Sequence, residues 1–224
     1  MRRMSIVTLA LVAAVTIGCN RDNRAENRSP DAVGTTGARD VSNSDKDFVR
    51  DLAIAGMAEV ELGKLAAEKS GNPEVKKFGQ MMIDDHSKAS DDLKAVTSKH
   101  GITPPTAVDD KHRKLRDDLA GKQGADFDRE YMEAMVEGHD DVLEKLEDRI
   151  DQQKLAEWKA EMSEQVSGEK RKERMEARTV VPEHSDNPVT MALNEWAASA
   201  YPIVYAHRER AKLLENSVKG KNTH

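Results

Sequence analysis

The sequence is poor in several features that mark common classes of protein. Its 224 residues include a single cysteine, Cys19, which excludes an intramolecular structural disulfide. Aromatic residues make up only 4%, so alanine, leucine and methionine carry the apolar content, as in helical bundles. The formal net charge of -6 argues against a nucleic-acid partner. A Walker loop, a dinucleotide-binding glycine pattern and a nucleophile elbow are also missing, and with them the signatures of several large enzyme classes.

The first residues have the pattern of an export signal. Two arginines precede an apolar run, residues 5–17, which is too short for a membrane-spanning helix of about 20 residues. A glycine before Cys19 resembles a bacterial lipobox, with Thr16 at a position where leucine is more usual. We therefore expect residues 1–18 to be a lipoprotein signal peptide and Cys19 to be the lipidated first residue of the mature protein. The alternative is an ordinary cleaved signal with an incidental cysteine.

A polar tether is expected between this anchor and the folded domain. Residues 19–44 contain almost no apolar side chains, so they cannot build a core. Asn20 stands where many inner-membrane lipoproteins have aspartate, which by resemblance favours the outer membrane, on the periplasmic side of a bacterial envelope. The rest is long enough for one domain with its own core, predicted over residues 45–218 with a tail at 219–224.

Four segments repeat apolar residues at steps of three and four, the spacing of helices that pack on one face. They cover about 45–70, 73–100, 126–150 and 188–218, and a short connecting helix is expected over 109–120. Prolines at two of the starts support these bounds, since proline suits the first position of a helix. The fourth stripe is predicted to consist of Val189, Leu193, Trp196, Ala200, Ile203, His207, Leu214 and Val218. The pattern predicts an all-α, up-down four-helix bundle.

Each of these helices carries one metal-capable side chain at the centre of its stripe, namely Glu59, His86, His139 and His207. A four-helix bundle brings the midpoints of its helices into one layer, so the four groups are expected to converge. A carboxylate and three imidazoles are suitable ligands for copper, zinc or iron, which predicts a site for one transition metal ion. Three further side chains are within reach as outer partners, Glu61, Asp85 and Tyr131. The alternative is a hydrogen-bonded network that fixes helix register without a ligand.

A di-iron site is not expected. Such sites need a Glu-x-x-His pattern on two helices and a glutamate on each of the others. The residues three positions before the histidines are instead Ile83, Val136 and Val204. Ferroxidase activity of the ferritin kind is therefore not predicted, and no catalytic residue is assigned. A hydrolase or oxidase with a mononuclear site is an alternative, in which Glu59 is the one evident general base.

A charged insertion, residues 151–185, separates the third and fourth helices and has only a weak helical stripe. The pattern predicts a helical extension that projects from the bundle, and a solvated arm is the usual role of such a run. In the alternative function, the protein is a structural or interaction module of the periplasm, and this arm contacts a protein partner. The sequence identifies neither the partner nor the oligomeric state.

Several of these segments together resemble one family. They are Gly56-Met57-Ala58-Glu59-Val60-Glu61-Leu62-Gly63, Val75-Lys76-Lys77-Phe78, Met82-Ile83-Asp84-Asp85-His86, Phe127-Asp128-Arg129-Glu130-Tyr131-Met132 before His139, and Tyr201-Pro202 before His207. They are similar to the domain-of-unknown-function 4142 family, except that Tyr201 replaces a leucine and the insertion is longer than usual. The resemblance implies a ferritin-like four-helix fold in an exported protein, often described as an outer-membrane protein, with no established activity.

Overall fold

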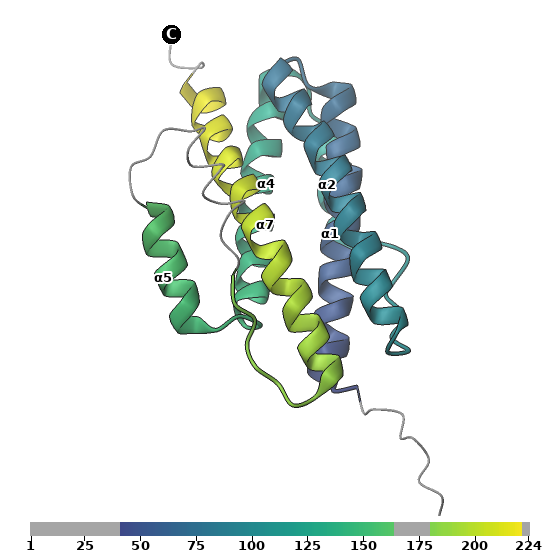
Figure 1. Cartoon of the computed structure of the whole chain (residues 1–224). Helices are drawn as coiled ribbons and strands as arrows, with labels where there is room; N and C mark the ends of the chain where they lie inside the picture. The colour runs from purple at the N-terminus through teal and green to yellow at the C-terminus, as the bar shows by residue number, and fades with distance from the viewer. Residues whose placement is uncertain (1–40, 164–179, 221–224) are drawn as a thin grey trace, which may run out of the picture. The chain divides into compact units, whose positions relative to one another are not determined.

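The computed structural model describes residues 41–163 and 180–220 (Figure 1). Within these ranges the chain forms six α-helices and no β-strand, so the predicted all-α bundle is confirmed. The bundle consists of α1 (Asn43–Lys69), α2 (Pro73–Ser98), α4 (Gly124–Glu147) and α7 (Pro188–Gly220), and the two shorter helices are α3 (Asp110–Ala120) and α5 (Gln152–Ser163). No helix among the described residues is both long and apolar enough to cross a membrane. The predicted signal peptide, with Cys19, lies outside the described residues.

The four long helices form two antiparallel pairs joined by a crossover connection. Helix α1 packs most closely against α2, and α4 against α7. Helix α3 lies against α1 and α4 and returns the chain to the end of the bundle where α2 began, since Lys69 at the end of α1 donates a hydrogen bond to the carbonyl oxygen of Ala120 at the end of α3. Neighbouring helices are therefore antiparallel in space, while the order along the chain is up, down, down, up. A single crossover of this kind is a feature of ferritin-like bundles.

Local signals in the sequence fix where the long helices begin. Ser42 caps α1 by accepting a hydrogen bond from the backbone N–H of Asp45 at 3.0 Å, so this helix begins two residues earlier than expected. Asn72 caps α2 and is followed by Pro73, as predicted. Asn187 accepts a hydrogen bond from the N–H of Val189 at the start of α7.

Two glycines allow α1 and α2 to approach each other closely. A Cβ at Gly63 would lie 2.6 Å from the carbonyl oxygen of Gly79, and a Cβ at Gly79 would lie 2.8 Å from that of Gly63. Any side chain at either position would push the helices apart. His86 follows Gly79 by seven residues, about two turns, and so points to the same side of α2. The glycine contact thus helps to set the position of His86.

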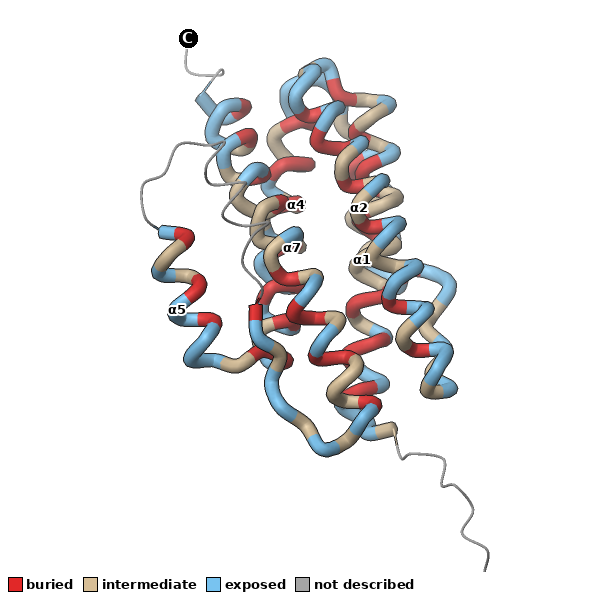
Figure 2. The backbone as a smooth tube through the Cα atoms, in the orientation of Figure 1, coloured by how far each residue is buried: buried red, intermediate tan, exposed pale blue. Residues whose placement is uncertain are grey.

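A layer of polar side chains divides the apolar core into two clusters. The first cluster surrounds the start of α1 and includes Phe48, Leu52, Leu93, Val142, Leu146 and Leu193. The second surrounds its other end and includes Leu62, Phe78, Met82, Tyr131, Met135 and Leu214. Figure 2 shows that buried positions line the inner face of all four long helices. The polar residues Glu59, His86, His139 and His207 are all buried between the clusters.

The inner face of α7 differs from the predicted stripe. The structure buries Ala197, Tyr201 and Val204, whereas the predicted Ile203 is 52% exposed. Trp196 and Ala200 are only partly buried. The prediction was wrong here because α7 is apolar on more than one side, so that spacing alone could not select the side that faces the core.

The insertion does not project from the bundle over its first part. Helix α4 ends at Glu147, and α5 turns back against α7, where Trp158 packs edge-on against Tyr201 and Tyr205 with ring centroids 5.6 and 5.1 Å apart (Figure 1). Burial of Trp158 and two further apolar side chains of α5 explains why this segment docks. The prediction of a solvated arm is thus wrong for α5, and residues 164–179 lie outside the described part of the chain.

A buried ion pair stands at the base of this insertion. Arg149, just after α4, donates a hydrogen bond to Asp45 of α1 at 2.6 Å, and Thr190 of α7 donates another to the same carboxylate at 2.8 Å. Burial acts to raise the pKa of Asp45, but the hydrogen bonds from Arg149, Ser42 and Thr190 outweigh it and hold that pKa below its ordinary value. The pair therefore connects three helices of the bundle.

Candidate metal centre

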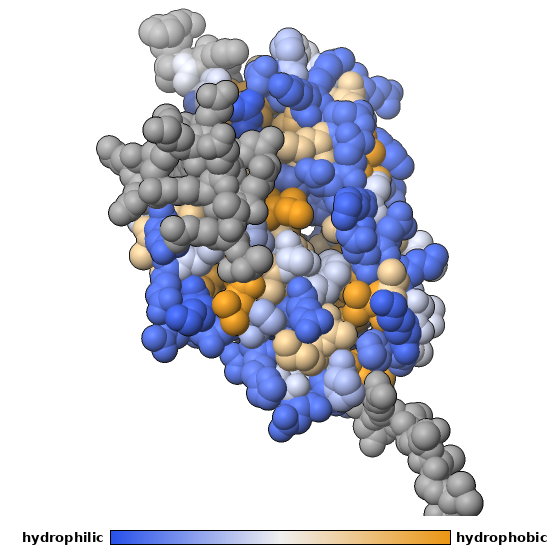
Figure 3. Space-filling view, in the orientation of Figure 1, coloured by the Kyte–Doolittle hydropathy of each residue, from blue (hydrophilic) through white to orange (hydrophobic). Residues whose placement is uncertain are grey.

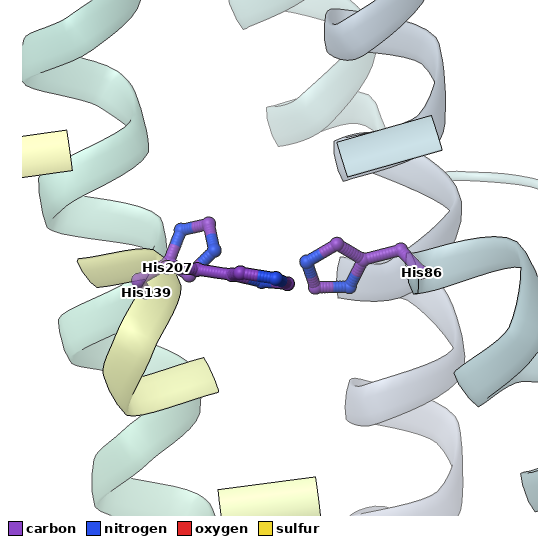
Figure 4. Close-up of side chains that lie close together, drawn as sticks. All are labelled: His86, His139 and His207. Carbon is purple, nitrogen blue, oxygen red and sulfur yellow. The ribbon is translucent and has the colours of Figure 1, made fainter. Parts of the chain in front are cut away.

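Three of the four predicted site residues come together at the centre of the bundle. His86 of α2, His139 of α4 and His207 of α7 each place a ring nitrogen within 4.8 Å of the other two. Their ring centroids are 5.6 Å apart for the first pair, 5.4 Å for His86 and His207, and 5.6 Å for His139 and His207. Figure 4 shows the imidazoles turned toward one another. We call these residues the three-histidine cluster.

One nitrogen of each ring is buried without a hydrogen-bond partner among the described residues. These nitrogens are Nε2 of His86, Nε2 of His139 and Nδ1 of His207. Buried polar atoms in proteins are nearly always paired, so three such atoms in one cluster require an explanation. A metal ion is one, because a neutral imidazole nitrogen with a free lone pair is the form that binds metals.

The opposite ring nitrogens of two histidines are held by the protein. Nδ1 of His139 lies 2.7 Å from the carbonyl oxygen of Met135, and Nε2 of His207 lies 2.8 Å from a carboxylate oxygen of Asp85. Both oxygens accept hydrogen bonds, so each of these nitrogens carries the proton. In the neutral ring the lone pair is then on the other nitrogen, which is the buried one without a partner among the described residues. Metal-binding histidines usually have such partners.

The surroundings keep the imidazoles neutral. Burial is the main cause that lowers the pKa of each histidine of the cluster, and that of His139 falls to about 3. Repulsion between neighbouring rings lowers the pKa of His86 and His139 further, whereas Asp85 partly offsets the effect of burial on His207. All three rings are therefore unprotonated at neutral pH, as ligation of a metal requires.

Glu59 lies beside the cluster and outside this group of three. Its Oε1 is 3.6 Å from Nδ1 of His139, the nitrogen that already bonds to Met135. The carboxyl group has room there because α4 has a glycine at Gly138, where a Cβ would lie 3.0 Å from Oε1. Burial raises the pKa of Glu59 to about 8, and its Oε2 has no partner among the described residues. Glu59 therefore lies next to Nδ1 of His139, the nitrogen that bonds to Met135, rather than next to the unpartnered Nε2.

The three side chains expected as outer partners of the metal ligands do not all contact the histidines. Asp85 contacts His207 as predicted. Glu61 instead pairs with Arg116 of α3, at 2.9 Å. Tyr131 is buried near Glu59, and burial, followed by that carboxyl group, raises its pKa. The carbonyl of Met135 was not anticipated, although an acceptor four residues before a histidine is always present in a helix.

The comparisons with known proteins can be set beside this geometry. The model of a family described as "Domain of unknown function (DUF4142)" matches residues 31–175, more than half of the chain. The chain belongs to this family. No curated protein and no solved structure matches it. The DUF4142 match includes Glu59, His86 and His139, but it ends before α7, which supplies His207.

The donor set in this DUF4142 chain fits a single late transition metal ion. Zinc and similar ions hold imidazole nitrogens at about 2.0–2.1 Å, so three ligands of a tetrahedral ion lie roughly 3.3 Å apart. Nitrogens within 4.8 Å need only a small inward movement to reach that spacing. Imidazole suits zinc, copper and iron alike. A di-iron site would need glutamates three residues before histidines. In this chain those positions hold the apolar residues Ile83, Val136 and Val204.

A cavity of about 200 Å³ reaches the cluster from the side of α2 and α7. His86 and His207 both line it, together with Trp196, Ala200 and Ile203 of α7. Figure 3 shows this face of the protein, where a hollow between the two helices has apolar side chains on one side and hydrophilic ones on the other. The cavity therefore ends at the rings of two of the three cluster histidines.

Proposed function

We propose that this DUF4142 chain binds one transition metal ion, copper, zinc or iron, through His86, His139 and His207. The observation that carries the proposal is the three-histidine cluster itself, whose rings place ligand nitrogens within 4.8 Å of one another and in which each ring has one buried nitrogen without a partner among the described residues. An unsatisfied buried polar group costs about 1–3 kcal/mol, and one bound ion would satisfy all three.

The alternative, an internal hydrogen-bond network, is less well supported. Such a network would join Glu59 to the histidines, yet its nearest approach is 3.6 Å, to a nitrogen that already bonds to Met135. Among the described residues, no hydrogen bond joins any two of Glu59, His86, His139 and His207. A buried water could still bridge the three nitrogens, so metal and water must be separated by experiment.

Elemental analysis of the mature protein, purified without chelator, tests the metal. We expect about one ion per chain in the wild type and a large loss in a His86→Ala, His139→Ala double variant. A His112→Ala, His184→Ala variant removes as many histidines outside the cluster and should keep the ion. Circular dichroism would confirm that each variant is helical. A metal-free wild type whose melting temperature does not rise with added copper, zinc or iron would reject the proposal.

We also propose that the chain is a lipoprotein of the bacterial envelope, anchored through Cys19, with the outer membrane favoured. The support is the sequence of residues 1–20. Cys19→Ser should release the protein from the membrane into the soluble fraction and abolish labelling by fatty acid. Unchanged membrane association of that variant would contradict the anchor.

We propose, as the alternative function, that the charged insertion contacts a protein partner. Because α5 packs on the bundle, the remainder of the insertion is the better candidate for such a contact. Replacing residues 164–179 by a glycine-serine linker of equal length should leave metal content and melting temperature unchanged. Loss of a co-purifying partner in that variant would support an interaction module, and retention of the partner would exclude this segment.

A further inference from the structure

We infer that the ion held by the three-histidine cluster keeps one coordination position open to a small, mainly apolar molecule that carries a single donor atom. An azole or a thiol is the chemical class that fits. This inference rests on the proposed metal site and adds to it a ligand and a route, the cavity between α2 and α7.

The two sides of the histidine layer are packed differently. On the side of the second core cluster, Phe78, Met82 and Met135 are buried and fill the space, and the ring of Phe78 lies 6.4 Å from that of His139. On the other side, the cavity extends from His86 and His207 to Val142, one turn beyond His139 along α4. An ion held by the cluster would therefore be reached from the side of the cavity.

Small side chains create this space. Gly56 of α1, Ala89 of α2 and Ala200 of α7 all line the cavity. A Cβ at Gly56 would lie 3.1 Å from the hydroxyl oxygen of Ser90, so even one methyl group would narrow the passage. Tightly packed cores rarely leave such gaps, which makes a cavity lined by two histidines of the cluster notable.

The lining determines the kind of ligand. Apolar side chains dominate it, including Leu93, Trp196, Ile203 and Val204. The charged side chains at the cavity already have partners, since Lys88 pairs with Asp92 at 2.6 Å and Asp85 bonds to His207. A charged ligand would lose its hydration without gaining an ion pair, whereas an apolar body would be favoured. The ion is then the one strong attachment point, and a single donor atom suffices.

The unusual surface of α7 supports a binding role for this cavity. Ile203 is 52% exposed, and Trp196 is only partly buried, although both are apolar and lie beside the opening. Exposed apolar residues around a cavity are typical of ligand sites. A ligand would cover this surface.

The test uses the mature full-length chain loaded with Cu²⁺ and titrated with 4-methylimidazole, followed by the visible and paramagnetic resonance spectra of the ion. We expect saturable binding of one molecule per ion, with the ion still bound after dialysis. Ala200→Leu and Ala89→Leu fill the cavity and should each weaken binding of 4-methylimidazole by about tenfold, with metal content unchanged. Ala95→Leu makes the same change at an exposed position of α2 outside the cavity and should have no effect.

Each other outcome counts against the inference in a defined way. Spectra that do not respond to 4-methylimidazole would show a closed coordination sphere. Equal affinity in the Ala200→Leu and Ala89→Leu variants would show that the ligand does not use the cavity. Tighter binding of acetate than of 4-methylimidazole would overturn the ligand class. A wild type that retains no ion would reject the proposed function, and the inference with it, whereas the first three outcomes leave the metal site intact.

Discussion

Asp85 of α2 accepts a hydrogen bond from Nε2 of His207 of α7 over 2.8 Å, across 122 positions of sequence. The contact joins the α1–α2 pair to the α4–α7 pair at the level of the cluster. It also leaves the lone pair of the neutral imidazole on Nδ1, which is buried and has no partner among the described residues. The side chain of His207 is almost fully buried, while that of Asp85 is 44% exposed, so one end of this bond meets solvent.

Asp85→Ala should weaken metal binding without removing a ligand. Outer partners of metal-bound histidines typically contribute about 10–100-fold in affinity, and we expect a loss in that range. Competition with a chromophoric chelator would measure it. Asp84→Ala is the matched control, because Asp84 is exposed and bonds to Gln80. Equal affinity in both variants would show that the contact does not support the site.

Glu59→Gln should change how the stability of the metal-free protein depends on pH. Burial raises the pKa of Glu59 from 4.5 to about 8, so the folded state keeps a proton that the unfolded chain releases. The stabilisation is complete below about pH 4.5 and is lost as the pH rises to about 8. We expect the wild type to lose a few kcal/mol over that range relative to Glu59→Gln. Urea unfolding from pH 5 to 8 measures this, with Glu61→Gln as a surface control.

The histidine cluster should make the metal-free protein less stable as the pH falls below 6.5. Burial lowers the pKa of His139 from 6.5 to about 3, so below pH 6.5 the unfolded chain binds a proton that the folded state excludes. This contribution to stability is present above pH 6.5 and is lost as the pH falls toward 3. The metal-free wild type should therefore be most stable near pH 6.5. In His139→Leu the acid limb should be shallower, and an unchanged limb would contradict the assignment.

Breaking the buried pair of Asp45 and Arg149 should destabilise the fold. Removing one partner leaves an uncompensated buried charge, so Arg149→Met should cost about 3–5 kcal/mol in the free energy of unfolding. An Asp45→Ala, Arg149→Met double variant should recover part of that loss. Arg50→Met serves as control, because the ion pairs of Arg50 with Asp47 and Asp51 are on the surface, where solvent and salt screen them and leave them little effect on stability. Equal losses for Arg149→Met and Arg50→Met would refute the prediction.

Gly63→Ala should separate α1 from α2. The added Cβ would meet the backbone of Gly79, which cannot move aside as a side chain can, and we expect a loss of at least about 1–3 kcal/mol in unfolding free energy. Gly71→Ala is the control, because a Cβ there has nothing within 4 Å. If both variants unfold at the same urea concentration, the close approach does not limit stability.

The sequence was sufficient to find the cluster because of where its histidines lie. Each has apolar residues at steps of three and four on both sides, so the face that carries the stripe also carries the imidazole into the core. Prolines at the starts of α2 and α7 placed those helices correctly. Glu59 was correctly expected to be buried, but the rotation that brings its carboxyl group beside Nδ1 of His139 depends on Gly138. The spacing of apolar residues along a helix does not predict that rotation.

Other features depended on residues far apart in the chain. Asp45 and Arg149 are 104 positions apart, and neither has a local signal for burial. Trp158 lies among charged residues, and the aromatic partners that bury it, Tyr201 and Tyr205, belong to another helix. These tyrosines also help to explain why the buried side of α7 was predicted incorrectly. Apolar residues of α7 contact α5, the cavity and the core, so this helix is apolar on more than one side.

The separation between α4 and α7 has a consequence for biogenesis. His86 and His139 leave the ribosome well before His207, with the entire insertion in between. A chain that is still being synthesised can therefore present only two of the three imidazoles until α7 has formed and docked. An ion bound by two imidazoles alone would be held more weakly than by three, so tight binding at the proposed site would require that α7 has docked.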